Sequence, residues 1–123
     1  MNYLRAVYNS FMPRATSPED VAKARELVEN MILSSRVAVF SKSYCPYCTE
    51  AKRILQAETG GEGVTVLELD QRADGSVIQQ YLAERAQQTK VTVPQIYIRQ
   101  QLRGGCSELK AIQSQGKLAG MLA

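Results

Sequence analysis

The sequence contains neither histidine nor tryptophan among its 123 residues. Histidine is the commonest metal ligand and a frequent general base, so its absence excludes Cys-His pairs, Ser-His-Asp triads and histidine-based metal sites. The sequence also lacks any apolar run of the roughly 18 residues that a membrane-spanning helix needs. We therefore expect a soluble protein with no membrane partner, whose chemistry depends on other side chains.

Positive charge is present but is not concentrated. The net charge of +3 comes from Lys and Arg residues scattered along the chain, whereas nucleic-acid-binding proteins usually gather such residues on one face. Hydrophobic residues make up 45% and charged residues 22% of the chain, which is ordinary for one packed domain. We expect no nucleic-acid partner and a single domain over residues 17–123.

Residues 1–16 form an N-terminal extension in this interpretation. They include Arg5 and Arg14 but no acidic residue, a composition that resembles a mitochondrial presequence, and they lack the apolar segment of a secretory signal. A disordered or loosely docked tail is the other hypothesis. The expected compartment is the cytoplasm, with the mitochondrion as the alternative.

The chain has three cysteines, of which Cys45 and Cys48 form a Cys-x-x-Cys pair. Three are too few for the disulfide scaffold of a small secreted protein. A zinc site needs four ligands, and Cys106 is the one cysteine left beyond the pair. Two inert core cysteines would leave the proline after Cys45 unexplained. The pair therefore indicates redox chemistry in a reducing compartment.

Apolar periodicity divides the rest of the chain into helices and strands. Helical spacing and capping residues predict helices at about 18–33 and 46–57, after Asp74, and around 109–112. Apolar runs predict strands at 37–40, 64–69, 96–98 and 102–103. This order predicts an α/β protein with a thioredoxin-like fold, in which a four-stranded mixed sheet is flanked by helices on both faces.

Cys45 lies directly after a predicted buried strand and at the start of a predicted helix. Unpaired N–H groups and the helix dipole favour a thiolate there, and such sites lower a cysteine pKa from about 8.5 to roughly 3.5–7.5. Lys42 can add positive charge from the same loop. Cys48 lies one turn further along the same face and is expected to be more buried. We therefore expect Cys45 to attack and Cys48 to resolve.

Three segments together resemble the dithiol glutaredoxin family. They are Phe-Ser-Lys-Ser-Tyr-Cys-Pro-Tyr-Cys at 40–48, Thr-Val-Pro at 92–94 and Gly-Gly-Cys-Ser-Glu-Leu at 104–109. The resemblance covers about 34–116. Thioredoxins typically carry Trp-Cys-Gly-Pro-Cys, and this chain has no tryptophan. The resemblance implies a glutathione-dependent oxidoreductase that reduces protein–glutathione mixed disulfides and protein disulfides through Cys45.

The resemblance also implies a glutathione site. Its residues would be Lys42, Tyr47, Gln79, Val93, Pro94, Gly105, Cys106, Ser107 and Glu108. Pro94 would be a cis-proline beside the reactive sulfur, leaving Val93 free to pair with the tripeptide. The chain departs from the family at 79–92, which is about two residues longer, and at Val91, where Arg or Lys is common.

Within that implied site each charged group of glutathione has a partner. Lys42 and Gln79 would meet the glycine carboxylate. The γ-glutamyl carboxylate would sit on the backbone N–H groups of Cys106 and Ser107, because a helix N-terminus binds anions. Glu108 would take the ammonium. Cys106 is expected to be a packing residue or a secondary thiol rather than a third catalytic group.

Glutathione is thus the expected co-substrate, glutathionylated and disulfide-containing proteins are the expected substrates, and a monomer without a metal is the expected state. Two alternatives stay open. Some glutaredoxins hold a [2Fe-2S] cluster between two subunits, against which Pro46 and the intact cysteine pair argue. The other alternative is a thioredoxin reduced by a flavoenzyme.

Overall fold

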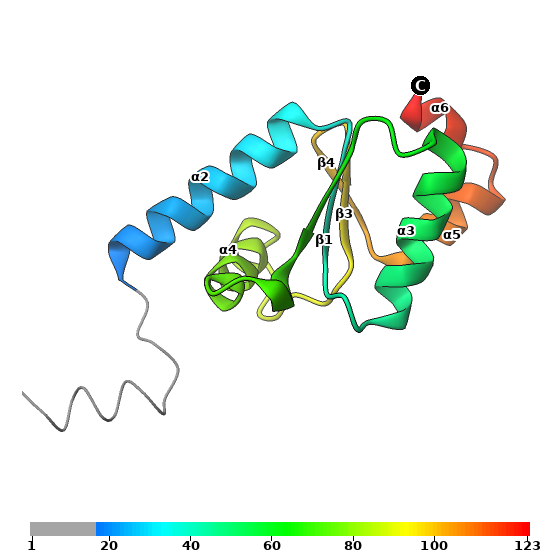
Figure 1. The fold of residues 1–123 in the computed structure, drawn as a ribbon. Coiled ribbons are helices and arrows are strands. Elements are labelled where there is room, and N and C mark those ends of the chain that lie inside the picture. The colour runs from blue at the N-terminus through cyan, green and yellow to red at the C-terminus, as the bar shows by residue number, and fades with distance from the viewer. Residues whose placement is uncertain (1–16) are drawn as a thin grey trace, which may run out of the picture.

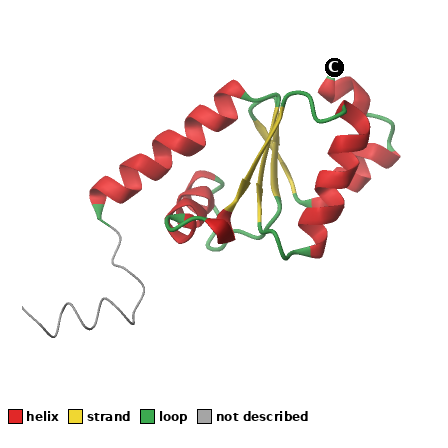
Figure 2. Cartoon of the chain, in the orientation of Figure 1, coloured by secondary structure: helices red, strands yellow, loops and turns green. Residues whose placement is uncertain are grey.

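The computed structural model describes residues 17–123, so both hypotheses about residues 1–16 concern a segment outside the described residues. The described elements are α2 (Pro18–Ser34), β1 (Val37–Ser41), α3 (Pro46–Thr59), β2 (Val64–Glu68), the short 3-10 helix η1 (Leu69–Gln71), α4 (Gly75–Arg85), β3 (Gln95–Ile98), β4 (Gln101–Gly104), α5 (Cys106–Ser114) and α6 (Leu118–Leu122). The sheet stands between two layers of helices, with α2 and α4 on one side and α3, α5 and α6 on the other (Figure 1 and Figure 2).

The four strands lie in the order β2-β1-β3-β4. β1 runs parallel to β2 and antiparallel to β3, while β3 and β4 form the predicted hairpin. All five residues of β1 are buried, as expected of a strand covered by helices on both faces. The predicted α/β arrangement, with a mixed sheet of four strands between two helical layers, is confirmed.

Side chains of β1 alternate between the two layers because successive residues of a strand point to opposite faces. Ala38 and Phe40 belong to the apolar core under α2 and α4, whereas Val37 and Val39 belong to the core under α3 and α5. Phe40 meets Tyr97 of β3 edge to face, with ring centroids 5.9 Å apart. The alternation therefore determines which of the two apolar cores each side chain of β1 joins.

The helix boundaries follow from local chemistry. Ser17 caps α2 by accepting a hydrogen bond from the N–H of Asp20, 3.1 Å away, and α3 ends at Gly60, whose φ of 69° suits glycine. Asp74 stands at the expected position before α4, but its carboxylate pairs with Arg72 at 2.8 Å and makes no cap hydrogen bond. The short helix α6 was not predicted.

No described helix is long and apolar enough to cross a membrane.

The predicted strand at 64–69 ends one residue early, because Leu69 begins η1 instead. The turn that follows carries the chain to α4 and brings Asp70 beside the loop that leaves β1. That loop, between β1 and α3, contains the first cysteine of the pair.

Candidate active site

Cys45 occupies the N-cap position of α3, and Pro46 is the first residue of the helix. Its backbone N–H donates to the carbonyl of Lys42 at 3.1 Å, which closes the loop after β1. Its own carbonyl accepts from the N–H of Thr49 at 3.1 Å and starts the helical hydrogen bonds. The side chain is partly accessible, so the chain geometry places a reachable sulfur at the helix N-terminus.

The pKa of Cys45 is lowered from the ordinary thiol value. Burial acts against the thiolate, but the backbone N–H groups of Cys48 and Tyr47, the thiol of Cys48 and the charge of Lys52 outweigh it. The neutral thiol makes no cap hydrogen bond of standard geometry. The sequence predicts a thiolate at this position, the lowered pKa is consistent with that prediction, and the structure adds Lys52 to the groups that lower it.

Cys48 is fully buried, and its pKa moves the other way. Burial raises the pKa most, and the neighbouring Cys45 raises it further, while the backbone N–H of Lys42 and the hydroxyl of Ser41 lower it. The Lys42 N–H lies 3.4 Å from the Cys48 sulfur. One turn of helix thus holds one sulfur with a lowered pKa and one with a raised pKa, which is the direction that the expected roles of the two cysteines require.

Lys42 contributes its backbone to this site, whereas its charge acts on Asp70. The Asp70 carboxylate accepts hydrogen bonds from the N–H of Ser43 at 2.9 Å and from the Ser43 hydroxyl. These donors, helped by the charge of Lys42, hold the pKa of Asp70 below its usual value. Sequence reasoning missed this contact, since 27 residues separate Ser43 from Asp70.

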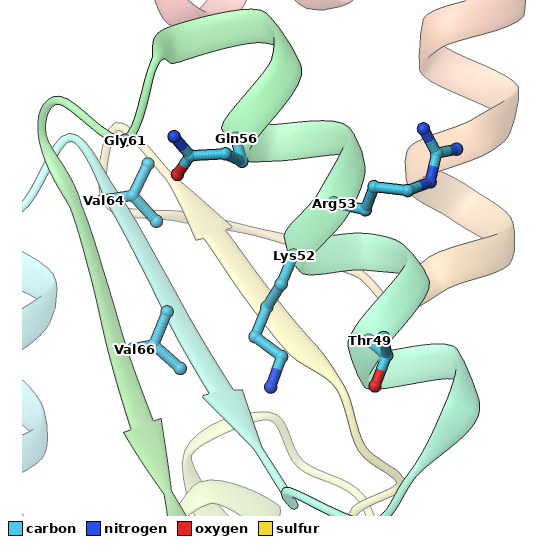
Figure 3. Close-up of a pocket in the computed structure, with 7 residues that line it drawn as sticks. All are labelled: Thr49, Lys52, Arg53, Gln56, Gly61, Val64 and Val66. Carbon is cyan, nitrogen blue, oxygen red and sulfur yellow. The ribbon is translucent and has the colours of Figure 1, made fainter.

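Lys52 lies in a groove between α3 and β2, shown in Figure 3. The groove has a volume of about 430 Å³ and is lined by Thr49, Lys52, Arg53, Gln56, Gly61, Val64 and Val66. Glu68 at the end of β2 holds the Lys52 ammonium at 3.2 Å, and Arg53 pairs with Glu50 at 2.6 Å. Both cations of the groove are therefore paired with carboxylates. A signal for Lys52 exists in the sequence, because it follows Cys45 by two helical turns.

A second hollow of about 210 Å³ lies beside the cysteine pair. It is lined by Tyr47, Thr92, Val93, Pro94, Gly105, Cys106, Ser107 and Glu108. The Val93–Pro94 bond is cis, as the resemblance implied, and the Cys45 sulfur lies 4.0 Å from the carbonyl oxygen of Val93. The structure thus brings seven of the nine predicted glutathione-binding residues to one hollow and adds Thr92.

The start of α5 forms part of the wall of this hollow. A Cβ at Gly105 would lie 3.2 Å from the carbonyl oxygen of Pro94, so the close approach favours glycine. Glu108 reaches back to accept a hydrogen bond from the N–H of Gly105 at 2.8 Å. The N–H groups of Cys106 and Ser107 are the first two of α5, where no intrahelical acceptor exists.

Gln79 and Lys42 do not line this hollow. Gln79 donates its side-chain amide to the carbonyl of Val91 at 3.3 Å. It lines a neighbouring hollow of about 320 Å³ together with Ser76, Gln80, Ala83, Thr89, Lys90 and Val91. Val91 itself is buried. Their predicted role at a glycine carboxylate stays a prediction, as do the other ligand contacts.

Cys106 is buried at the first position of α5, and burial raises its pKa. Lys110 acts in the opposite direction, while Glu50, Cys45 and Glu108 add to the rise. A thiol with a raised pKa and little exposure is a poor nucleophile. Over residues 17–123 no group of three or more Cys, Asp or Glu side chains is placed to hold a metal ion.

Comparison with known proteins gives a consistent result. A sequence model of the glutaredoxin family matches residues 37–103. Glutaredoxin-1 of Rhizophagus irregularis is 40% identical over 103 residues, covering 84% of this chain and 98% of the relative. A glutaredoxin of Ricinus communis is 44% identical over 102 residues, covering 83% and 92%. The solved buckwheat glutaredoxin–glutathione complex superposes with a TM-score of 0.78 at 33% identity, covering 87% and 94%.

Proposed function

Since this chain belongs to the glutaredoxin family of glutathione-dependent thiol-disulfide oxidoreductases, we propose that Cys45 is its attacking thiolate and Cys48 its resolving thiol. The observation that carries the proposal is the opposite pKa shift of the two sulfurs within one helical turn. The thioredoxin-like fold, shared with solved glutaredoxins, supplies the strand, loop and helix that hold them. The Cys-Pro-Tyr-Cys sequence places the chain, in this proposal, among the dithiol glutaredoxins that cycle between thiol and disulfide.

The reaction is thiol-disulfide exchange. The Cys45 thiolate attacks the glutathione sulfur of a glutathionylated protein, the original S–S bond breaks, and the protein thiolate leaves and takes up a proton. Cys45 then carries glutathione as a mixed disulfide. A second glutathione thiolate attacks the bound glutathione sulfur, which releases the Cys45 thiolate and forms glutathione disulfide. A leaving thiolate at Cys45 is favoured because its pKa is lowered.

Protein disulfides take a second branch. After Cys45 has formed a mixed disulfide with the substrate protein, Cys48 attacks the Cys45 sulfur and expels the protein thiol, which closes the Cys45–Cys48 disulfide. Glutathione then restores the dithiol. The burial of Cys48 supports this order, since a hidden sulfur meets its neighbour on the same helix more readily than a free substrate.

Glutathione is proposed to bind in the hollow beside Pro94. Its γ-glutamyl carboxylate meets the N–H groups of Cys106 and Ser107, which supports an anion site because they begin a helix. Glu108 takes the ammonium with the carboxylate oxygen that Gly105 does not use. The buckwheat complex, a relative of the same fold solved with glutathione, supports the assignment of the ligand.

The remaining contacts of the tripeptide lie on the other side of the sulfur. Val93 pairs with its backbone, Tyr47 covers it, and Lys42 and Gln79 meet its glycine carboxylate. The side chain of Tyr47 is 67% exposed, which supports a role in contacting a ligand or substrate. The small volume of the hollow, about 210 Å³, suits part of a tripeptide rather than all of it.

Several further properties complete the proposal. Residues 17–123 form the catalytic domain, and residues 1–16 are an extension that it does not need. The protein works as a monomer in the cytoplasm, on glutathionylated and disulfide-containing proteins, without a metal. The mitochondrion is the alternative compartment, which imaging of the full chain against one lacking residues 1–16 decides. After anaerobic purification we expect an absorption spectrum without iron–sulfur bands, whereas a bridging [2Fe-2S] cluster would give such bands.

One assay tests the core of the proposal. Reduction of a glutathionylated peptide, coupled to glutathione and glutathione reductase, should proceed in the unmodified chain and in Cys48→Ser, because glutathione clears the adduct on Cys45. Reduction of a protein disulfide should be mostly lost in Cys48→Ser. Loss of both activities in Cys48→Ser would make the enzyme an obligate dithiol reductant and overturn the first branch. Reduction by a flavoenzyme instead of glutathione would favour a thioredoxin.

A further inference from the structure

Ser41 is a buried polar residue at the end of β1. It is fully buried, and within residues 17–123 its hydroxyl has no hydrogen-bond partner of standard geometry. The alternation along β1 turns Ser41 toward the same face as Val37 and Val39, which pack under α3. A buried hydroxyl without a standard partner costs free energy, so a weak acceptor close by, such as a cysteine sulfur, matters to it.

Ser41 points to the face of the sheet that α3 covers, and Cys48 belongs to α3. Cys48 is buried on α3 in its first turn, and the backbone N–H of Lys42, the next residue after Ser41, lies 3.4 Å from its sulfur. The Ser41 hydroxyl also acts on this sulfur, because it is one of the groups that lower the pKa of Cys48. The titratable group that faces Cys48 is Cys45.

The balance at Cys48 changes during catalysis. In the dithiol form Cys45 raises the pKa of Cys48 twice, through its charge and through the hydrogen bond that the Cys48 thiol donates. Once Cys45 is part of a mixed disulfide, it is neutral and no longer has this effect. Burial then remains as the force against a Cys48 thiolate, and the donors at Ser41 and Lys42 are left to oppose it.

We propose that the Ser41 hydroxyl and the Lys42 backbone N–H form a pair of donors that stabilises the Cys48 sulfur as an anion while the Cys45–Cys48 disulfide closes. This inference rests on the proposed resolving role of Cys48. In the step, Cys48 gives up its proton, its sulfur bonds to the Cys45 sulfur, and the bond from Cys45 to glutathione breaks. The departing glutathione thiolate takes up a proton, so the step is balanced. Ser41 is a positioning residue that acts through Cys48.

The test is a time course of closure in the full chain. Reduced enzyme is mixed with a glutathionylated peptide, without free glutathione, in buffers between pH 5 and pH 9. Samples are quenched in acid at intervals, and the mass of the protein is measured by mass spectrometry. The glutathione adduct forms first, and the intramolecular disulfide replaces it. In Ser41→Ala we expect closure about five- to tenfold slower at neutral pH, with its pH midpoint moved upward. Adduct formation in the same time course is the reference.

Val39→Ala is the matched control, because Val39 is buried on the same face of β1 and its side chain has no donor for a sulfur. It should lower the melting temperature and leave the pH midpoint of closure in place. Ser41→Ala should keep or raise the melting temperature, because it removes a polar group that has no standard partner. A Ser41→Ala midpoint that coincides with the unmodified chain, or an equal shift in Val39→Ala, overturns this inference alone. Failure of the unmodified chain to form the disulfide overturns the proposed dithiol branch as well.

Discussion

Two helices of this protein begin with a cysteine, and the two thiols behave in opposite ways. Cys45 occupies the N-cap position of α3 and has a lowered pKa. Cys106 is the first residue of α5 and has a raised pKa. A helix N-terminus favours a thiolate in general, so the position alone does not explain the difference.

The side chains differ in where they stand relative to the first turn. An N-cap side chain can face the N–H groups of the second and third helical residues, which here belong to Tyr47 and Cys48 and lower the pKa of Cys45. Cys106 lies one position further on, packed in the core with Leu109, and burial dominates. The start of α3 thus lowers the pKa of its cysteine, whereas in the proposal the start of α5 contributes backbone N–H groups to glutathione binding.

The strongest test of this contrast is to remove each thiol in turn. Cys45→Ser should abolish activity on every substrate, because serine does not ionise at neutral pH and no other cysteine of the chain has a lowered pKa. Cys106→Ser should keep activity within about twofold, since it replaces a side chain that takes no part in the exchange. The glutathione-coupled assay measures both. Comparable losses in the two variants would mean that α5 also supplies a reacting sulfur.

The same contrast can be measured without mutation, through the pH dependence of alkylation. The lowered pKa of Cys45 means that its thiolate persists as the pH falls below about 8.5, and is lost only as the pH passes the lower folded value. The raised pKa of Cys106 shifts its titration upward. At pH 6, iodoacetamide should modify Cys45 about a hundredfold faster than Cys106. Peptide mapping of the full chain identifies each site, and an alkylation midpoint near 8.5 for Cys45 would contradict the assignment.

A smaller effect separates binding from reactivity. Gln79→Ala and Lys42→Ala should each raise the glutathione concentration needed for half-maximal activity by about ten- to a hundredfold, because charge-assisted hydrogen bonds to a carboxylate contribute roughly 1.5–3 kcal/mol. Gln79→Ala should leave the alkylation midpoint of Cys45 unchanged, which shows that the loss lies in recognition. Unchanged glutathione dependence in both variants would place the glycine carboxylate elsewhere.

The contrast between the two cysteines also shows how far the sequence leads. Strand 37–40, Pro46 and the Cys-x-x-Cys spacing were enough to predict that Cys45 begins a helix. The partners of the charged side chains could not be predicted in the same way. The ammonium of Lys52 on α3 is held by Glu68 at the end of β2, 16 residues away in the sequence, so the pair depends on how α3 packs beside that strand.

Longer-range packing accounts for the other differences. The resemblance assigns Lys42 and Gln79 to one carboxylate, which stays a prediction; the sequence did not show that Gln79 also donates to Val91 and lines a separate hollow. Val91 lies in the loop between α4 and β3, whose path no local sequence pattern predicts. Helix α6 was missed for a similar reason. It has only five residues, too few for an apolar periodicity to stand out, and the burial of Leu118 and Leu122 in the core beside α3 stabilises it.

The smallest predicted effect concerns the cation beside Cys45. Lys52→Met should raise the alkylation midpoint of Cys45 by about half a pH unit, which slows alkylation about threefold below the midpoint, because one partly screened charge is lost. The sign follows from the direction in which Lys52 acts on that pKa. Lys52→Arg keeps the charge and should keep the midpoint. Lys110→Met is the matched control, since Lys110 acts on the pKa of Cys106. An equal shift in Lys110→Met would mean that net charge, rather than the placement of Lys52 on α3, sets the reactivity of Cys45.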